Sequence, residues 1–318
     1  MLQVFRLAPK IITILNAGST KTMSDAKSVT QKGGIGSKNT QIEKQINLYS
    51  GISYSDVKNL CISLIEKKLS EYRQEALAIA EERSNRLTET FLGKLAEEKM
   101  EYEKVIEEFK NPDMQYAFVA AQKSFIRTGT PDLEKILSDL LINRLKENNR
   151  SLLQIALSEA INVVSILLPE QMHILALCFA VSRTSWPIIS HSDLIDYIKQ
   201  AMMPHVVPLV NYKLKHTPLL KHLEYTRCGY RNLAMENIEL IFLKSYPYIF
   251  LEGVNNNTMK PEKVKQKIIN IYPESSILFD VWNNSELPSF DLTTVGIAIG
   301  ASFFKQITGL HLNLSTWF

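Results

Sequence analysis

The sequence predicts a mainly α-helical protein, in which a long N-terminal helix or helix pair is followed by a multi-helix bundle with minor β content. Three observations support this fold class. Apolar residues recur at steps of three and four over residues 57–109, which is the spacing of one helix face. After residue 110, proline or a capping residue marks one helix start after another. The connections between these starts are short, as in bundles of antiparallel helices.

The composition excludes several classes of protein. The chain has 318 residues, a formal net charge of +3 and 45% hydrophobic residues, which argues against global disorder and indicates no nucleic-acid partner. Its three cysteines, Cys61, Cys178 and Cys228, are few and far apart, as expected in a reducing cytoplasm. No apolar run reaches the roughly 20 residues that span a bilayer, because Pro169 interrupts the nearest one. We therefore expect a cytoplasmic protein without a membrane span.

The first 50 residues divide into two parts. Residues 1–22 do not resemble a signal peptide, and we expect them to be an extension outside the native protein, with Met1 and Met23 as alternative starts. Residues 23–50 form a polar low-complexity segment, which is typical of disordered chain. Residues 40–48, however, place three apolar side chains on one face at strand spacing. They fit either a flexible tail or a small intermolecular β-assembly with stacked Asn and Gln side chains.

Residues 51–110 predict the element that organises the chain, a long amphipathic helix that begins near Ser53 in a capping-box-like sequence. At ~1.5 Å per residue the helix would be roughly 85 Å long, which is more than one small domain covers. It therefore projects, pairs with another copy as a coiled coil, or folds back. The expected positions for a kink or break are Gly93 and the polar pair Ser84 and Asn85. A buried core helix and an intermolecular coiled coil both fit the pattern.

Two helical regions follow the long helix. Residues 111–247 predict a helical bundle, and residues 248–318 predict a small helical C-terminal subdomain with minor strand content. Short strands are expected at residues 248–251 and 310–314. Helices are expected at residues 112–127, 131–147, 151–167, 169–181, 190–203, 236–244, 260–271, 275–282 and 293–307.

One group of residues carries the types of side chain that bind zinc. His216, His222, Glu224 and Cys228 lie within one short stretch, and zinc accepts imidazole, carboxylate and thiolate ligands. Their spacing matches no common zinc pattern, and the stretch has no Cys-x-x-Cys pair. A structural corner with solvent-facing histidines explains the stretch as well, and we assign no metal ligand.

Three further patterns resemble known sites but have simpler explanations. His191, which has serines on both sides and Asp193 two residues later, fits a helix cap, because members of a catalytic triad come from distant positions. The glycine-rich residues 33–36 lack the lysine and the preceding strand of a phosphate loop. Gly296 and Gly300 form a Gly-x-x-x-Gly pattern that predicts close helix packing. We therefore assign no catalytic and no cofactor-binding residue.

Six stretches of the sequence carry a family resemblance: residues 31–48, 51–57 (GISYSDV), 111–117 (NPDMQYA), 147–154 (ENNRSLLQ), 222–229 (HLEYTRCG) and 292–300 (LTTVGIAIG). They resemble an uncharacterised family of bacterial proteins, and the resemblance covers nearly everything after Met23. The family has no assigned activity, so the resemblance implies no catalytic residues. Its Gln-, Gly- and Asn-rich opening is similar to tags on bacterial conflict and phage-defence proteins, which implies a defence context without a mechanism.

We expect a non-enzymatic interaction or regulatory protein that forms a homo-oligomer through residues 40–110. An exposed apolar stripe normally marks an interface, so replacing Leu87 and Phe91 by Asp should lower the oligomeric state without unfolding the body. One alternative is a metal-dependent hydrolase or nuclease effector that uses the zinc-type residues. Another is a membrane-perturbing effector that acts through residues 2–16 and the apolar C-terminal helix.

Overall fold

The mainly helical fold that the sequence predicts is confirmed, and the strand content is minor. The chain divides into two units, residues 1–70 and 71–318, and its first described helix begins in the first unit. The predictions for residues 1–50, and His216, lie outside the described residues. The computed structural model describes residues 54–100, 102–147, 150–184, 186–212, 214, 218–252, 257–310 and 312–318.

The predicted long helix is a helix pair, α3 (Tyr54–Glu97) and α4 (Tyr102–Phe109). The helix α3 ends after Glu97, residues 98–100 are not helical, and Lys99 among them adopts a positive φ of 51°. The predicted break positions were wrong: the helix continues through Gly93 and through Ser84, whose carbonyl oxygen accepts a hydrogen bond of 2.8 Å from Thr88 Oγ1. This hydrogen bond joins residues one turn apart and is compatible with a regular helix, so the polar residues near Ser84 do not interrupt α3.

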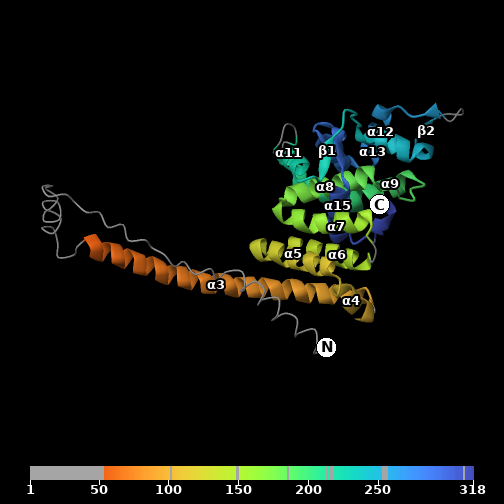
Figure 1. Ribbon diagram of the computed structural model, residues 1–318. Coiled ribbons are helices and arrows are strands. Elements are labelled where there is room, and N and C mark those ends of the chain that lie inside the picture. The colour runs from red at the N-terminus through yellow and green to blue at the C-terminus, as the bar shows by residue number, and fades with distance from the viewer. Residues whose placement is uncertain are drawn as a thin grey trace. The chain divides into compact units, whose positions relative to one another are not determined.

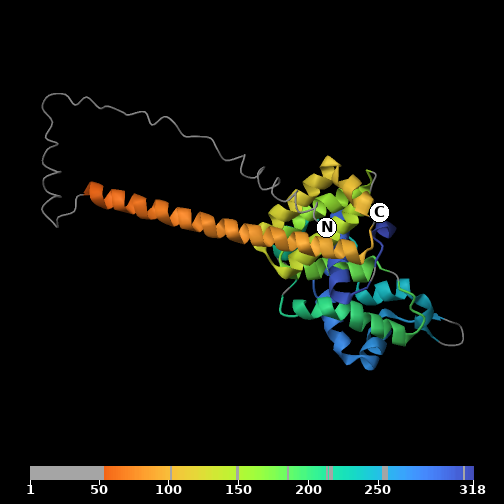
Figure 2. The same ribbon diagram turned by 90° about the horizontal axis from the view of Figure 1, so that it is seen from below.

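The C-terminal half of α3 packs on the helices that follow it (Figures 1 and 2). Leu87, Phe91 and Leu95 are buried, and their spacing of four places them on one face of the helix. The Phe91 ring contacts Phe109 of α4 and Phe118 of α5 edge to face, with centroids 6.1 and 5.5 Å away. The stripe that was predicted to be an exposed interface is therefore, at these positions, part of the core.

Four helices then follow in close succession; a side chain caps the start of two of them, and proline occupies the first position of three. The Asn111 side chain accepts from the Asp113 amide at 3.0 Å, and Ser151 Oγ accepts from the Gln154 amide at 3.0 Å. Gly129 ends the first of them with a φ of 68°, a left-handed conformation that favours glycine. The four are α5 (Pro112–Thr128), α6 (Pro131–Lys146), α7 (Leu152–Val163, then a 3-10 turn, Val164–Ile166) and α8 (Pro169–Ser182).

The next segment begins with the predicted cap at Ser190. Ser190 and Asp193 form a reciprocal capping box, in which each side chain accepts from the other's backbone amide, at 3.2 and 2.9 Å. The grouping of serine, histidine and acid around His191 is therefore a helix start. The elements here are α9 (His191–Tyr197), a π-helical turn (Ile198–Met202), α10 (Met203–Val206) and a 3-10 turn (Val207–Leu209).

The remaining elements include the only strand pairs among the described residues. In one pair, β1 and β4 are antiparallel with Gly229 opposite Leu292; in the other, β2 pairs with β3. The strand predicted at residues 248–251 is mostly a 3-10 turn. The described residues of the range 310–314 form no strand, and residues 314–317 make a 3-10 turn. The elements are α11 (Pro218–Tyr225), β1 (Gly229–Arg231), α12 (Ile238–Ser245), β2 (Leu251–Glu252), β3 (Asn257–Thr258), α13 (Pro261–Ile271), α14 (Ser276–Asn283), β4 (Phe290–Leu292) and α15 (Thr294–Thr308).

The helix α15 lies inside the body and contacts α6, α7 and α8 (Figures 1 and 2). Every residue from Val295 to Phe304 is buried. The predicted close packing at its glycines is confirmed: a Cβ on Gly296 would lie 1.8 Å from the Cys228 carbonyl oxygen, and one on Gly300 would lie 2.7 Å from that of Leu175. Residues 248–318 thus share one hydrophobic core with the preceding helices, and no core boundary falls at residue 247.

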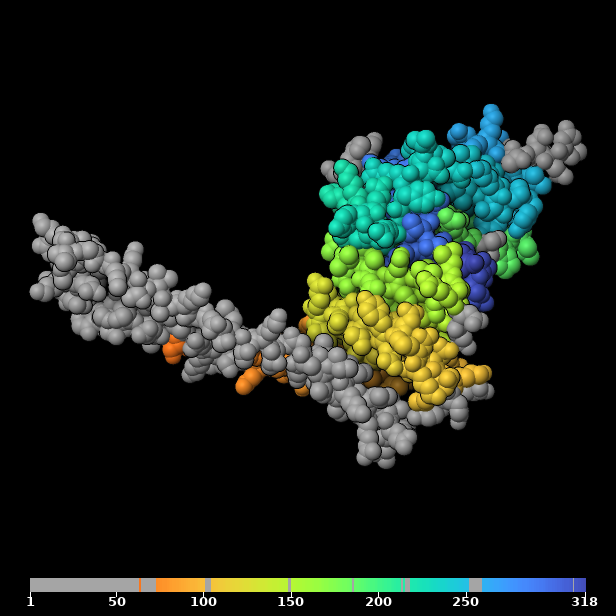
Figure 3. Space-filling view, viewed as in Figure 1, coloured from red at the N-terminus to blue at the C-terminus, as the bar shows by residue number. Residues whose placement is uncertain are grey.

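On the visible face of the body, segments that follow one another in the sequence lie next to one another. In the space-filling view, α5 and α6 form a yellow band, α7 and α8 a green one, and residues 218–250 a cyan one beyond them (Figure 3). Consecutive segments are therefore neighbours in space, as short connections require. The exception is α15, which returns to the middle of this series and brings its own side chains against α6 and α8.

Candidate functional site

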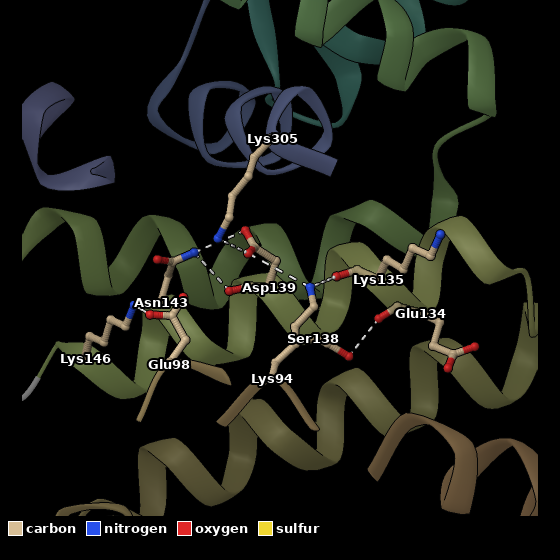
Figure 4. Close-up of polar contacts among 9 residues, drawn as sticks. All are labelled: Lys94, Glu98, Glu134, Lys135, Ser138, Asp139, Asn143, Lys146 and Lys305. Atoms are coloured by element: carbon tan, nitrogen blue, oxygen red, sulfur yellow. Dashed lines mark hydrogen bonds and ion pairs between the residues drawn. The ribbon is translucent and has the colours of Figure 1, made fainter. Parts of the chain in front are cut away.

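Charged side chains from three helices meet at one carboxylate (Figure 4). Asp139 Oδ1 of α6 accepts a hydrogen bond from Lys305 Nζ of α15 at 2.8 Å. The same oxygen lies 3.9 Å from Lys94 Nζ of α3. We call these three residues the Asp139 cluster. Because its members come from α3, α6 and α15, the cluster connects the C-terminal half of α3 to the centre of the body.

The neighbours of Asp139 explain how a carboxylate is held in a largely buried position. Its side chain is only 7% exposed, and an isolated charge there would lose much of its hydration energy. Asn143, one helical turn later, donates from Nδ2 to Asp139 Oδ2 at 3.2 Å. Lys94 donates to the carbonyl oxygen of Lys135 at 2.8 Å, which fixes its ammonium beside the carboxylate. Both oxygens of the buried carboxylate therefore have partners.

A cavity of about 440 Å³ opens beside the Asp139 cluster, within the ~300–1,000 Å³ range of small-molecule sites. Three of its lining residues are lysines and two are acids. Glu97 and Lys135 are exposed at its edge, whereas Asp139 is buried inside. The cavity is lined by Thr90, Gly93, Lys94, Glu97, Lys135, Asp139, Ser302, Lys305 and Gln306.

The electrostatics of the cavity follow from two ammonium groups that share one carboxylate. Burial lowers the pKa of Lys94 below its ordinary value, the Asp139 charge opposes this, and the Lys305 charge adds to it. Ser302 Oγ and Gln306 Oε1, which belong to lining residues, are themselves buried away from the surface and find no hydrogen-bond partner in the part of the chain that the structure describes. The two ammonium groups are suited to hold an anionic group, as they hold the Asp139 carboxylate.

The sequence alone did not predict this cluster, because no short stretch of sequence indicates it. Asp139 and Lys305 are 166 residues apart, and each has the sequence surroundings of an ordinary charge on a helix. One weak signal exists: Asp139 directly precedes the apolar run that begins at Leu140, in a helix whose other buried positions are mostly apolar. Burial of a charge in such a face requires a partner from elsewhere in the chain.

Two of the stretches that carry the family resemblance meet at a second charged group, Arg144, which is fully buried. Its guanidinium forms an ion pair with Asp113 and donates to Ser158 Oγ and to the Glu147 carbonyl oxygen, both at 3.2 Å. The Gln154 amide, oriented with Oε1 toward the guanidinium, accepts from it at 2.9 Å. These bonds tie the start of α5 to the end of α6 and to α7, so the polar residues of these two stretches are explained by packing.

Two other stretches of the resemblance meet at the β1–β4 pair. The Cys228 carbonyl oxygen accepts from the Thr293 amide at 3.2 Å, and the Arg227 carbonyl oxygen accepts from Thr293 Oγ1 at 2.5 Å. Thr293 also caps α15, because its hydroxyl accepts from the Gly296 amide at 3.2 Å. These hydrogen bonds join the segment of α11 and β1 to the start of α15, so the polar residues of these two stretches stabilise the fold.

The zinc-type residues that the structure describes contact different partners. His222 Nδ1 lies 3.0 Å from Gln171 Nε2, and Glu224 pairs with Arg231 at 3.2 Å. Cys228 is buried, and burial raises the pKa of its thiol to about 11, which disfavours the thiolate that binds metal. Within the described part of the chain no group of three or more His, Cys, Asp or Glu side chains could hold a metal ion.

A pair of histidines lies beside α15, with His205 buried and His173 half-buried. His173 Nδ1 of α8 and His205 Nδ1 of α10 are 3.3 Å apart, and the His205 ring stacks on Phe304 with centroids 5.7 Å apart. Burial, and secondarily the nearby His173, lowers the pKa of His205 to about 3. Burial also lowers the pKa of His173, against the opposing charges of Asp132 and Glu170. Both imidazoles are therefore neutral at pH 7.

Comparison with known proteins gives a match to a protein family. The model of an uncharacterised protein family matches residues 51–258 and 254–318. No curated protein and no solved structure matches the chain. Among the described helices, none combines the length and the apolar character needed to cross a membrane.

Proposed function

The chain belongs to the uncharacterised family whose model matches residues 51–258 and 254–318, and we propose that it is a non-enzymatic interaction protein that assembles with copies of itself through α3. One observation carries the proposal. All side chains from Arg73 to Ile79 are exposed, including Leu77 at 52% and Ile79 at 46%, although they belong to a continuous helix. Exposed apolar residues in a long helix are typical of a surface that another helix covers.

The proposed interface is narrower than residues 40–110, because the second half of α3 is occupied. Leu87, Phe91 and Leu95 pack against the body, so replacing Leu87 and Phe91 by Asp would unfold it, contrary to the sequence-based prediction. We therefore restrict the proposed interface to residues 40–83. The helical part of this range supplies the exposed leucine and isoleucine, and the part before it supplies the β-compatible sequence.

A second copy of the same chain is the partner that the sequence favours. Parallel association of identical helices would bring the copies of residues 40–48 together at one end. A short strand is not stable alone but can pair with an identical neighbour that is held close to it. Pairing there would in turn fix the register of the helices, so the two segments support each other.

The experiment is light scattering of the full chain at micromolar concentration. We expect an oligomer for the unaltered protein and a smaller species for a variant with Leu77→Asp and Ile79→Asp. The matched control is Leu233→Asp, at a fully exposed leucine outside α3, which should leave the assembly unchanged. A monomeric unaltered protein, or an unchanged mass in the α3 variant, would show that α3 is not the interface.

Defence against phage is the proposed context, and it is supported by the resemblance of the N-terminal segment to tags on bacterial conflict proteins. Plaque counts on bacteria that express the chain test this part separately. We expect protection by the unaltered protein and its loss in the Leu77→Asp and Ile79→Asp variant. Equal plaque counts with and without the unaltered protein would refute the defence role while leaving the assembly to be judged by light scattering.

The two alternative functions find less support. His222, Glu224 and Cys228 engage separate partners, which weakens the case for a metal-dependent hydrolase or nuclease. Elemental analysis tests it, since stoichiometric zinc would favour that alternative. The C-terminal helix α15 is buried in the core, so a membrane-perturbing effector would first have to unfold the body. Flotation of the protein with liposomes tests this alternative.

A further inference from the structure

We propose that two copies of the chain exchange the C-terminal half of α3, so that the α3 of each copy packs on the body of the other. The exchanged segment is residues 84–97, and the hinge is the turn between α3 and α4. The proposal goes beyond assembly through residues 40–83, because it uses a different part of α3 and leaves that range free. Three features support it: the conformation of the turn, its sequence and the surface that α3 covers.

The turn after α3 has the hydrogen bonds of a Schellman motif, but a lysine occupies the position where glycine is usual. The Lys99 amide donates to the Ala96 carbonyl oxygen at 3.2 Å, and the Met100 amide donates to that of Leu95 at 3.4 Å. Lys99 has a φ of 51°, in the left-handed region that is unfavourable for a residue with a Cβ. The left-handed residue at the end of α5 is Gly129, which adopts this conformation at little cost. The turn after α3 is therefore strained.

The sequence of the turn favours a helix instead. Residues 96–104 read AEEKMEYEK, with neither glycine nor proline, and alanine, glutamate, lysine and methionine are strong helix formers. For the same reason the sequence predicts a helix that continues through this point. The packing of side chains, and no local helix-breaking residue, therefore keeps the turn closed. Once α3 leaves its own body, α3 and α4 would join in one helix.

The surface that α3 covers is identical in a second copy. Phe109 of α4 contacts Phe118 of α5, with centroids 5.6 Å apart, so α4 stays with the body when the turn opens. Phe91 of α3 packs on these two rings, and Arg86 of α3 donates to Glu134 of α6 at 2.7 Å. All of these partners follow the hinge in the chain. A second copy presents the same rings and the same carboxylate, so the exchanged helix recovers every one of these contacts.

The balance between the two forms therefore depends on the turn and on the protein concentration. Closure within one chain is favoured because the short turn holds α3 beside its own body. Exchange is favoured because it removes the left-handed lysine from both copies and replaces two strained turns by helix, and short strained hinges promote such exchange. An ion pair at the turn, between Glu98 and Lys146 at 2.8 Å, is partly exposed and opposes the opening only weakly (Figure 4).

Two chains with one new cysteine each test the exchange. Gln122 Nε2 of α5 donates to Ser84 Oγ of α3 at 3.0 Å, so these two side chains are in contact. One chain carries Ser84→Cys and the other carries Gln122→Cys, and both carry Cys61→Ser, since Cys178 and Cys228 are buried. The full-length chains are co-expressed, purified at several concentrations, oxidised and separated on a non-reducing gel.

We expect a disulfide-linked heterodimer whose yield rises with concentration, and no such dimer from either chain alone. A single chain with both substitutions is the control, because it shows whether the two positions can form a disulfide. If this control closes its disulfide within one chain and the two separate chains give no heterodimer, the proposal is overturned. Repeating the test with Leu77→Asp and Ile79→Asp in both chains separates it from the proposed assembly, since exchange should persist in that background.

Substitutions at the hinge should change the yield of heterodimer in opposite directions. Lys99→Gly relieves the left-handed residue and weakens the joined helix, so the yield should fall by at least about fivefold. Lys99→Ile places a β-branched residue in the left-handed position, so the yield should rise. Glu89→Gly is the control, because residue 89 is exposed and helical in both forms, and it should leave the yield unchanged. A yield that does not respond to residue 99 would refute the hinge.

Discussion

The rings of Phe91 and Phe109 lie edge to face, with centroids 6.1 Å apart and planes inclined by 68°. They belong to α3 and α4, the two helices on either side of the break after Glu97, so their contact shows that the chain folds back after α3. Phe118 of α5 completes the group, at 5.5 Å from Phe91 and 5.6 Å from Phe109. Three aromatic rings from three helices thus hold the C-terminal half of α3 on the body.

Removing the central ring should therefore cost much of the stability of the body. We expect Phe91→Ala to lower the free energy of unfolding by about 3–5 kcal/mol, because it deletes a buried aromatic side chain and leaves a cavity. The adjacent Leu92 is 38% exposed, and Leu92→Ala should cost less than about 1 kcal/mol. Urea unfolding of both variants measures the difference. Equal losses would mean that the ring contacts do not carry the packing of α3.

Replacing Gly296 and replacing Gly93 by alanine should change the stability of the protein in opposite directions. Gly296→Ala would place a Cβ 1.8 Å from the Cys228 carbonyl oxygen, so β1 and α15 would have to separate, and we expect a loss of at least about 2 kcal/mol. Gly93 is a helical residue, and a methyl group added there would have nothing within 4 Å. Gly93→Ala should therefore raise stability by about 0.5–1 kcal/mol. Thermal unfolding distinguishes the two variants by the sign of the change.

The ion pair of Arg144 and Asp113 is expected to contribute more to the free energy of unfolding than an ion pair at the surface. Asp113→Ala leaves a fully buried guanidinium without its carboxylate. Because the Asp113 side chain is 55% exposed, water replaces it in part, and we expect a loss of about 1–3 kcal/mol. The comparison is Glu107→Ala, which removes an exposed partner of Lys110 and should cost less than about 1 kcal/mol. Chemical denaturation near pH 7 gives both values. A loss below about 1 kcal/mol for Asp113→Ala would show that the neutral partners of Arg144 suffice.

The buried histidines predict that stability falls on acidification. The folded-state pKa of His205 is lowered to about 3, below the ~6.5 of an unfolded chain, so the unfolded state binds the proton first. Stability is therefore full above pH 6.5 and is lost as the pH falls toward 3. From pH 7 to pH 5 this histidine alone contributes a loss of about 2 kcal/mol.

The variant His205→Phe tests the assignment of this pH dependence. It keeps a ring against Phe304 and removes the titrating group, so the difference in unfolding free energy between pH 7 and pH 5 should shrink by about 2 kcal/mol. The depressed pKa of Asp193 acts below its ordinary value of 3.8 and does not affect this range. An unchanged pH dependence in the variant would assign the effect to other groups.

The helix starts could be predicted because their causes are local. Pro112, Pro131 and Pro169 each stand at the first position of a helix, and Gly129 ends one in the left-handed conformation that favours glycine. The break after α3 could not be predicted in this way. It occurs at a lysine with positive φ, and it is favoured by the contact of Phe91 with rings that are distant in sequence.

The candidate site was not predictable for the same reason. Lys94, Asp139 and Lys305 have ordinary sequence surroundings, and only the position of α15 against α6 brings them together. The pairing of β1 with β4 is a similar case, since strands of three residues give too short a pattern to detect. Capping residues and prolines predict where helices begin and end. Contacts between side chains that are distant in the sequence depend on how the helices pack, and no short stretch of sequence predicts them.

The buried position of α15 has a consequence for the order of events during synthesis. The ribosome makes α3, α5, α6, α7 and α8 well before α15, yet these helices complete their core only when residues 294–308 have emerged. At ~5–20 residues per second, the nascent chain therefore spends several seconds with α3 exposed and the body unfinished. Neighbouring nascent chains on one messenger RNA could meet through α3 during that interval, before any of them has a closed body.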